Sequence, residues 1–231
     1  MSLKLYYDLM SQPSRALYIF LKVTNIPFEK KPVDLKALAH RTPEFEAINP
    51  FQKVPVIDNN GFKLTESIAI LRYLCREFDV QEHWYPKLSE AQARVDEYLE
   101  WQHLNTRLHC ASYFIVKFLT PKLSGKPPKA EKLAQFENRM SDCLDQIENI
   151  WLKERPFLIG DQISVADLVA ACEIEQPRMA GFEPRTGRPR LTAWMERVQI
   201  ETNPYYDEAH KILNLIANKN QGQIPQTLSR L

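Results

Sequence analysis

The stretch that decides the fold is LKLYYDLMSQPSRAL, residues 3–17. Leu3, Leu5 and Tyr7 recur at every second position, and this period predicts a strand. Pro13 stands where a first helical residue would lie, a position at which its fixed φ and missing N–H are tolerated. From Ser14 onward the apolar residues follow helical spacing. We therefore expect a strand that feeds a helix through a short polar break.

That polar break contains Ser11 and Gln12. The first N–H groups of a helix have no partner within the helix, and the helix dipole is positive at this end. The break is therefore suited to hold an anion. The alternative is that Ser11 or Gln12 merely caps the helix.

Composition describes an ordinary globular protein. The chain has 231 residues, 44% of them hydrophobic and 26% charged, with a formal net charge of +1. A nucleic-acid binder normally carries a strong basic excess, so we expect no nucleic-acid partner. The start of the chain lacks the apolar core of a secretory signal, and no run is long enough to span a membrane. Only six glycines occur, which favours many helices.

Four cysteines are scattered singly through helical patterns: Cys75, Cys110, Cys143 and Cys172. None belongs to a C-x-x-C pair, so neither a metal site nor a local redox pair is predicted. Buried, reduced thiols in a cytoplasmic protein are the simplest interpretation.

The first part of the chain has an α/β pattern. A second strand is expected over Phe28–Leu35, at a sheet edge because Pro32 cannot donate to a ladder. A right-handed crossover makes it parallel to the first strand. Thr42-Pro43 predicts a short helix start, Asn60-Gly61 a hairpin and Glu66-Ser67 the opening of another helix.

Beyond residue 88 every pattern is helical. The sequence SEAQ at 89–92 has the form of a capping box, and its helix is expected to run to Leu119 before Pro121. The sequence SVAD at 164–167 has the same form and opens a helix that is apolar on all sides, hence buried. The tail 218–231 is polar and gives no firm prediction. We divide the chain into residues 1–80, a linker at 81–88 and residues 89–231.

Four motifs now stand in the order and at the spacing of a glutathione S-transferase: SQPSR at 11–15, VP at 54–55, TES at 65–67 and SVAD at 164–167. The stretches at 8–16, 84–86 and 94–102 look most like the theta class. The resemblance covers nearly the whole chain and is weakest over 106–139 and in the tail. It implies an α/β thioredoxin-like N-terminal domain that binds glutathione and an all-α C-terminal domain that completes a hydrophobic pocket. It also implies a homodimer in the cytoplasm.

Ser11 resembles the catalytic serine of the theta class. Glutathione must lose its thiol proton to attack an electrophile, and a hydroxyl that donates to the sulfur favours the thiolate. Two other hydroxyls lie nearby in sequence. Tyr7 ends the strand, where other transferase classes place a catalytic tyrosine, and Ser14 lies one helical turn further on. The resemblance selects Ser11.

The remaining motifs imply the glutathione contacts. Val54-Pro55 resembles a cis-proline turn whose free backbone groups pair with the cysteinyl part of glutathione, although an ordinary trans proline is the plain alternative. Glu66 and Ser67 open a helix and are expected to hold the γ-glutamyl group. The resemblance adds the full set of expected glutathione contacts: Gln12, His40, Lys53, Val54, Pro55, Glu66 and Ser67.

The electrophile pocket is expected to draw on Leu9, Met10, Arg107, Ala111 and Phe114, from helical phase and from the resemblance. Some theta members carry an acidic residue three positions before Arg107, where this chain has Leu104. Ser164 and Asp167 are assigned to folding rather than to catalysis.

The resemblance implies attack of the glutathione thiolate on alkyl or aryl electrophiles, and reduction of organic hydroperoxides is a second activity that it suggests. Disulfide exchange would need a protein cysteine beside Ser11, and the nearest in sequence is Cys75. A non-catalytic ligand-binding or assembly module is the other alternative. Phe51 either inserts into a partner subunit or packs locally.

Overall fold

Strand β1 (Leu3–Tyr7) lies inside a four-stranded sheet whose order is β2-β1-β3-β4. The computed structural model describes residues 3–221. β2 (Phe28–Pro32) pairs with β1 in parallel, whereas β3 (Val56–Asn59) pairs with it in antiparallel fashion. β4 (Phe62–Leu64) completes the hairpin with β3. The parallel pairing and the edge position of β2 are confirmed, although β2 ends at Pro32 rather than at residue 35.

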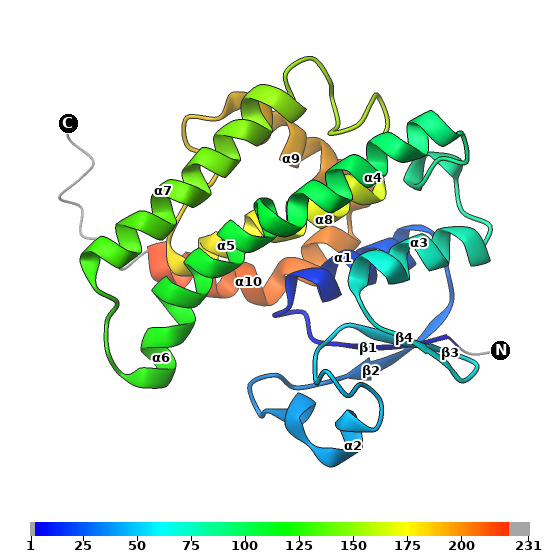
Figure 1. The fold of residues 1–231 in the computed structure, drawn as a ribbon, viewed down its shortest axis with the longest axis horizontal. Helices are drawn as coiled ribbons and strands as arrows, with labels where there is room; N and C mark the ends of the chain where they lie inside the picture. Colours follow the sequence, from blue (N-terminus) through cyan, green and yellow to red (C-terminus); the bar gives the residue numbers. More distant parts are fainter. Residues whose placement is uncertain (1–2, 222–231) are drawn as a thin grey trace.

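Successive side chains along each strand point to opposite faces of the sheet, and each face packs against a different hydrophobic cluster. Leu3, Leu5 and Tyr7 belong to the main core, under helices α1 (Gln12–Val23) and α3 (Ser67–Glu77). The opposite face of the sheet carries a small cluster that includes Tyr6, Val33, Phe45 and Val56. Phe45 comes from the short helix α2 (Pro43–Glu46), which begins after the capping residue Thr42 as expected. Figure 1 shows α2 on one side of the sheet and α1 and α3 on the other.

The turns of this unit follow their local chemistry. Asn60 and Gly61 both have positive φ, 52° and 95°, as the hairpin prediction required. The Val54–Pro55 peptide bond is cis, which confirms that prediction. A 3-10 turn, Ala39–Arg41, precedes α2, and another, Glu82–Trp84, lies in the connection to the helical unit.

The helical unit is built from seven α-helices, two π-helical turns and a 3-10 turn over the residues described. The α-helices are α4 (Ser89–Leu104), α5 (Thr106–Phe114), α6 (Thr120–Ser124), α7 (Ala130–Gln146), α8 (Val165–Glu175), α9 (Pro189–Thr202) and α10 (Tyr205–Gln221). The π turns are Ile115–Leu119 and Ile147–Trp151, and the 3-10 turn is Gln176–Ala180. The expected tail begins within α10, and its residues 222–231 lie outside the described range.

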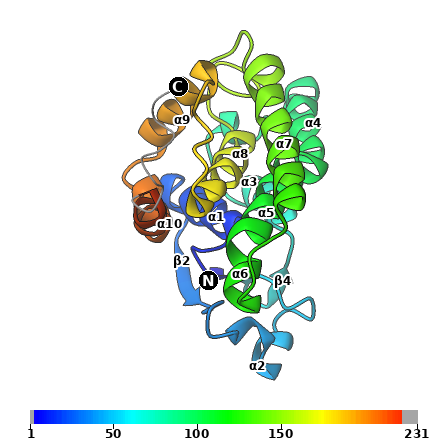
Figure 2. The same cartoon turned by 90° about the vertical axis from the view of Figure 1, so that its left-hand side faces the viewer.

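Helix α8 is the centre of this unit. All of its residues are buried, and it contacts α1, α4, α5 and α9. Figure 2 shows α8 enclosed between α9 and α10 on one side and α4, α5 and α7 on the other. Its predicted capping box is present, with the Asp167 carboxylate accepting a hydrogen bond of 2.9 Å from the Ser164 N–H.

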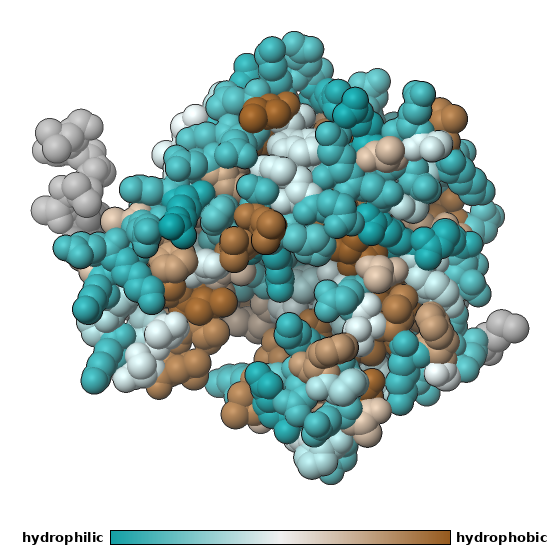
Figure 3. Space-filling model, viewed as in Figure 1, coloured by the Kyte–Doolittle hydropathy of each residue, from teal (hydrophilic) through white to brown (hydrophobic). Residues whose placement is uncertain are grey.

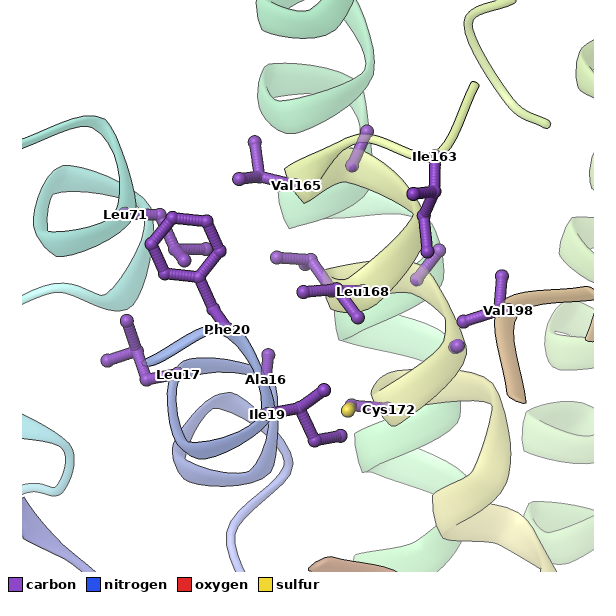
Figure 4. Close-up of a cluster of buried hydrophobic side chains, with 14 of the residues drawn as sticks. Ala16, Leu17, Ile19, Phe20, Leu71, Ile163, Val165, Leu168, Cys172 and Val198 are labelled. Atoms are coloured by element: carbon purple, nitrogen blue, oxygen red, sulfur yellow. The ribbon is translucent and has the colours of Figure 1, made fainter. Parts of the chain in front are cut away.

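One continuous core joins the two units. Ala16 and Ile19 of α1 face Leu168 and Cys172 of α8 in the interface drawn in Figure 4, and Phe20 lies beside Leu71 of α3. The interface therefore holds α1, and the loop before it, at a fixed position against the helical unit.

Two helix predictions are wrong. The expected single helix over 89–119 breaks at Asn105, whose φ and ψ are −121° and −96°. Its side chain donates to the Trp101 carbonyl at 2.8 Å, and such a local bond competes with helical pairing. Pro121 does not end the helix either, because it lies in the first turn of α6, where proline is tolerated.

The capping box expected at 89–92 is also wrong. Leu88 precedes the helix, and it makes no side-chain capping bond. The Gln92 side chain instead donates to the Pro86 carbonyl at 2.9 Å.

Candidate active site

A cleft with about 840 Å³ of empty space opens between the two units. Its walls come from the start of α1, the loop 49–55, the start of α3, the α4–α5 junction and the middle of α8. Six of the residues expected from the sequence line it: Lys53, Val54, Pro55, Glu66, Ser67 and Arg107.

The loop before Val54 is shaped by the buried side chain of Asn49. Its Nδ2 donates to the Lys53 carbonyl at 2.7 Å, and its Oδ1 accepts from the Phe51 N–H at 3.0 Å. These two bonds hold the loop so that Lys53, Val54 and Pro55 face the cleft.

The positive end of α3 also faces the cleft. Glu66 is the residue before the helix and has a φ of 64°, a conformation that costs energy in a side-chain-bearing residue. No side chain caps this helix and its first turn contains no acid. The first N–H groups of α3 are therefore available to a ligand carboxylate.

Asp8 shapes the loop that carries Ser11. Its Oδ1 accepts from the Met10 N–H at 2.8 Å, and its Oδ2 accepts from the Leu35 N–H at 2.9 Å. The Ser11 N–H donates to the Asp8 carbonyl at 3.0 Å. Asp8 was not expected in this role.

Arg15 fastens the same loop to the helical unit. Its side chain is fully buried, and it donates to the Leu9 carbonyl at 2.9 Å and to the Cys172 carbonyl at 2.9 Å. A further bond of 2.7 Å reaches Oε1 of Gln176. Burial lowers the pKa of this guanidinium, while the negative groups nearby raise it. The loop is therefore positioned before any ligand binds.

The three candidate hydroxyls have different surroundings. Ser11 precedes α1, is half-buried and makes no side-chain capping bond. Tyr7 is buried and stacks on Tyr18 at 5.4 Å, and burial raises the pKa of its hydroxyl. Ser14 is fully buried within α1, and its Oγ has no partner. Ser11 is thus the most exposed of the three hydroxyl-bearing residues. Among residues 3–221, however, Ser11 is not one of those that line the cleft.

Other predicted residues also lie outside the cleft lining. Gln12 is buried at the start of α1. His40 lies in the 3-10 turn before α2, with Nδ1 buried and unpartnered, and burial and Arg41 lower its pKa. Leu9 packs on the main core. Ala111 is a half-buried residue of α5.

Met10 and Phe114 meet in a separate apolar cluster. Its buried members are Phe114, Met179, Leu213 and Ala217, with Met10, Phe118 and Ile216 packed against them. Figure 3 shows apolar side chains gathered beside the hollow that separates the region of α6 from the sheet unit. Apolar surface beside the Ser11 loop suits a hydrophobic ligand group.

Arg107 is held by Glu173, which the sequence did not single out. Nη1 of Arg107 donates to Oε1 of Glu173 at 2.6 Å, and 40% of the Arg107 side chain is exposed, against 3% for Glu173. Both residues line the cleft, together with Gln102 and His103. Leu104 is 73% exposed. The one available signal for Glu173 was a charged residue near the end of a mostly apolar helix, a signal that it shares with Glu175.

No metal site is evident in the described part of the chain, since no group of three His, Cys, Asp or Glu side chains is placed to hold an ion. Within residues 3–221, none of the helices is long and apolar enough to cross a membrane.

Comparison with known proteins relates both units to one family. The family description "Glutathione S-transferase, N-terminal domain" matches residues 1–76, and "Glutathione S-transferase, C-terminal domain" matches residues 109–199. Glutathione S-transferase theta-1 of Bos taurus is 44% identical over 214 residues, which are 92% of this chain and 89% of that protein.

Solved structures agree. The apo form of human glutathione-S-transferase T1-1 has a TM-score of 0.89 at 40% identity and covers 94% of this chain and 91% of its own. A human theta-class enzyme in complex with the glutathione conjugate of 1-menaphthyl sulfate has a TM-score of 0.86 at 40% identity, with 95% and 92% coverage. The thioredoxin-like and all-α fold expected from the sequence is confirmed, and the chain belongs to the glutathione S-transferase family, within its theta class.

Proposed function

We propose that this transferase activates glutathione through the hydroxyl of Ser11, which donates a hydrogen bond to the sulfur and stabilises the thiolate. The observation that carries the proposal is the loop of Ser11: Asp8 and Arg15 hold it in place, while the Ser11 hydroxyl is free of any capping bond. The loop adjoins the cleft, because Pro13, two residues later, lines it.

The energy required is modest. A free thiol has a pKa near 8.5, and each unit of lowering corresponds to about 1.4 kcal/mol. A charge-assisted hydrogen bond contributes about 1.5–3 kcal/mol and a helix N-terminus about 0.3–1 kcal/mol. Together they lower the thiol pKa by about one to three units, so no general base is needed.

We assign the parts of glutathione to the cleft as follows. The backbone of Val54 pairs with the cysteinyl part, and the N-terminus of α3 at Glu66 and Ser67 takes the γ-glutamyl carboxylate. Lys53 and His40 are assigned to the glycyl carboxylate and Gln12 to a further polar contact. Leu9, Met10, Arg107, Ala111 and Phe114 are assigned to the electrophile, which is an alkyl or aryl compound or an organic hydroperoxide.

Disulfide exchange is disfavoured by the state of the cysteines. All four are free, and burial raises the pKa of Cys75 to about 12, of Cys143 to about 11 and of Cys172 to about 12. Thiols with such pKa values are poor nucleophiles. Free thiols are also typical of a reducing compartment, and we propose the cytoplasm.

We further propose a homodimer in which Phe51 contacts the partner, since 68% of this large apolar side chain is exposed beside the cleft. Analytical ultracentrifugation of wild-type protein and of Phe51→Ser tests this proposal. The domain limits proposed are 1–80 and 89–231, joined by the linker 81–88.

The function is tested by retention on glutathione-agarose followed by turnover assays with alkyl halides, aryl halides and organic hydroperoxides. Retention with turnover supports the transferase, and the hydroperoxide arm decides whether it is also a peroxidase. Retention without any turnover would favour the non-catalytic alternative. No retention together with no turnover would overturn the proposal.

A further inference from the structure

The amide side chain of Gln176 contacts the loop of Ser11 from the helical unit. Gln176 begins the 3-10 turn after α8 and is 1% exposed. Its Oε1 accepts from Nη2 of Arg15 at 2.7 Å, and its Nε2 donates to the Met10 carbonyl at 3.4 Å. Met10 is the residue before Ser11. Gln176 therefore binds this loop both directly and through Arg15.

Arg15 carries the second connection to the loop. Its Nη1 donates to the Leu9 carbonyl at 2.9 Å and to the Met10 carbonyl at 3.4 Å, while Gln176 accepts from its Nη2. A guanidinium is planar and its donors have a fixed geometry, so a contact at one end of the group also limits the direction of the other end. Gln176 thus helps to orient the backbone carbonyls of the two residues that precede Ser11.

The contacts of Gln176 use both halves of its amide. An amide offers an acceptor oxygen and a donor nitrogen, and here the oxygen meets Arg15 while the nitrogen meets Met10. A carboxylate at this position would keep the acceptor for Arg15 and lose the donor for Met10. An aliphatic side chain would lose both. Gln176→Glu and Gln176→Leu therefore remove the contacts in two steps.

Apolar packing does not orient this loop by itself. Residues 8–11 are all half-buried, whereas the apolar residues of α1 and α8 that pack together are buried. The hydrophobic effect is non-directional, so it holds the two helices together without setting the direction of the loop carbonyls. A misplacement of about 1 Å near the reacting groups lowers rates by as much as about a hundred-fold. Hydrogen bonds to the loop backbone are therefore placed to affect reactivity.

We propose that Gln176 is a positioning residue for glutathione activation, because its amide orients the backbone that carries Ser11 and thereby the Ser11 hydroxyl. Within the part of the chain that the structure describes, Gln176 is not one of the residues that line the cleft. It acts on the thiol through Ser11 and does not touch glutathione. The inference rests on the proposed function and adds to it a residue of the helical unit.

The test is a double-mutant cycle between positions 11 and 176 of the full chain. Wild type, Ser11→Ala, Gln176→Leu and the double variant are compared by the pKa of bound glutathione, from thiolate absorbance, and by kcat with the halide that wild type consumes fastest. We expect Gln176→Leu to raise this pKa by about 0.5–1 unit and to lower kcat by about three- to ten-fold. In the Ser11→Ala background, Gln176→Leu should leave the pKa unchanged and kcat within about two-fold, because no hydroxyl remains to be misplaced.

Two controls separate positioning from a general loosening of the fold. The affinity of Gln176→Leu for S-methylglutathione, which has no thiol proton, should stay within about two-fold of wild type. Asn220→Ala is the matched variant, since Nδ2 of Asn220 donates to the Met179 carbonyl at 2.6 Å in the same 3-10 turn, and neither hydrogen-bond partner belongs to the loop of Ser11. Asn220→Ala should keep the wild-type pKa of bound glutathione.

Gln176→Glu replaces Gln176→Leu in the cycle if the leucine variant fails to fold, as judged by circular dichroism. The glutamate keeps an acceptor for the buried Arg15, and it loses only the donor to Met10. Any direct effect of its charge on the thiol is present with and without the Ser11 hydroxyl, so the cycle cancels this effect.

The outcomes separate this inference from the proposed function. Additive effects of the two substitutions, an unchanged pKa in Gln176→Leu, or equal pKa shifts in Gln176→Leu and Asn220→Ala would overturn the inference and leave the role of Ser11 in place. An unchanged pKa in Ser11→Ala contradicts the proposed function itself, and the inference falls with it.

Discussion

Arg15 of α1 and Gln176, in the turn after α8, are joined by a hydrogen bond of 2.7 Å between Nη2 and Oε1. The two residues are 161 positions apart, and neither residue is more than 1% exposed. The same guanidinium also donates hydrogen bonds to the backbone carbonyls of Leu9 and Cys172. One side chain of the sheet unit thus connects the Ser11 loop to the central helix of the other unit.

Replacing Arg15 by Met should therefore leave several buried acceptors unpaired. We expect the free energy of unfolding to fall by about 3–5 kcal/mol, as for the loss of one partner of a buried charged network. Chemical denaturation monitored by circular dichroism measures this change. Arg15→Lys, which keeps the charge but not the planar fork, should lose less; equal stability of Arg15→Met and wild type would contradict the assigned role.

Ser11→Ala should lower activity at neutral pH by about ten- to a hundred-fold, because the thiolate loses a charge-assisted hydrogen bond. The pKa of bound glutathione should rise by about one to two units. The ultraviolet absorbance of the thiolate, followed against pH in the binary complex, reports this pKa.

Tyr7→Phe is the control for Ser11→Ala. The Tyr7 ring is stacked on Tyr18 in the core, and burial raises the pKa of its hydroxyl. We expect activity within about three-fold of wild type, since the Tyr7 ring packs in the core and Tyr7 is less exposed than Ser11. A large loss in Tyr7→Phe with none in Ser11→Ala would reverse the assignment.

Asp167→Ala should be among the most destabilising substitutions in the chain. The carboxylate accepts four hydrogen bonds: from the N–H of Leu158 at 2.9 Å, the N–H of Ser164 at 2.9 Å, the hydroxyl of Ser164 at 2.8 Å and Nε1 of Trp194 at 2.8 Å. Its burial raises its pKa in spite of these donors. We expect a loss of about 3–5 kcal/mol by thermal or chemical denaturation.

Ser164→Ala removes only one partner from the same motif and should cost about 1 kcal/mol. Both variants should keep wild-type affinity for glutathione at temperatures where they remain folded. A folded Asp167→Ala protein that no longer binds glutathione would show that the motif does more than stabilise the fold.

His210 should make the fold sensitive to mild acid. Its imidazole is buried between Tyr206 and the charged groups Arg15, Glu175 and Arg178, and burial, followed by Arg15, lowers its pKa from 6.5 to about 3. At a pH between these two pKa values, His210 is protonated in the unfolded chain but not in the folded chain. Stability is therefore lost as pH falls below 6.5, by about 1.4 kcal/mol for each pH unit.

His210→Phe removes this proton uptake while keeping an aromatic ring against Tyr206. The stability difference between pH 7 and pH 5 should be about 2 kcal/mol smaller in the variant than in wild type. Glu175, whose pKa is lowered to about 2 by Arg185 and Arg178 against the effect of burial, stays ionised in the folded state over this interval. Identical pH dependence in both proteins would show that His210 titrates normally.

Several features could be predicted because a few neighbouring residues determine them. The alternation of residues 3–7 places Leu5 in the core, Asn60-Gly61 adopts the positive φ values of its turn, and SVAD caps its own helix. The order of these local motifs, with Val54-Pro55 between them, was sufficient to predict the fold and the family.

Local patterns failed where a competing contact came from a neighbouring side chain or from outside the segment. Asn105 interrupts the long helix by bonding to the Trp101 carbonyl, and Gln92 turns away from its capping position to Pro86. Hydrophobic periodicity predicts neither of these side-chain hydrogen bonds, because both depend on which acceptor lies within reach of the side chain.

The sequence by itself thus determined the two units, their order and the turn at which Ser11 stands. Only the tertiary structure decided what surrounds that turn. Arg107 meets Glu173 across 66 residues, and Arg15 reaches Gln176 across 161. Arg15 reaches Gln176 because α1 packs against α8, and Arg107 reaches Glu173 because α5 packs against α8 as well.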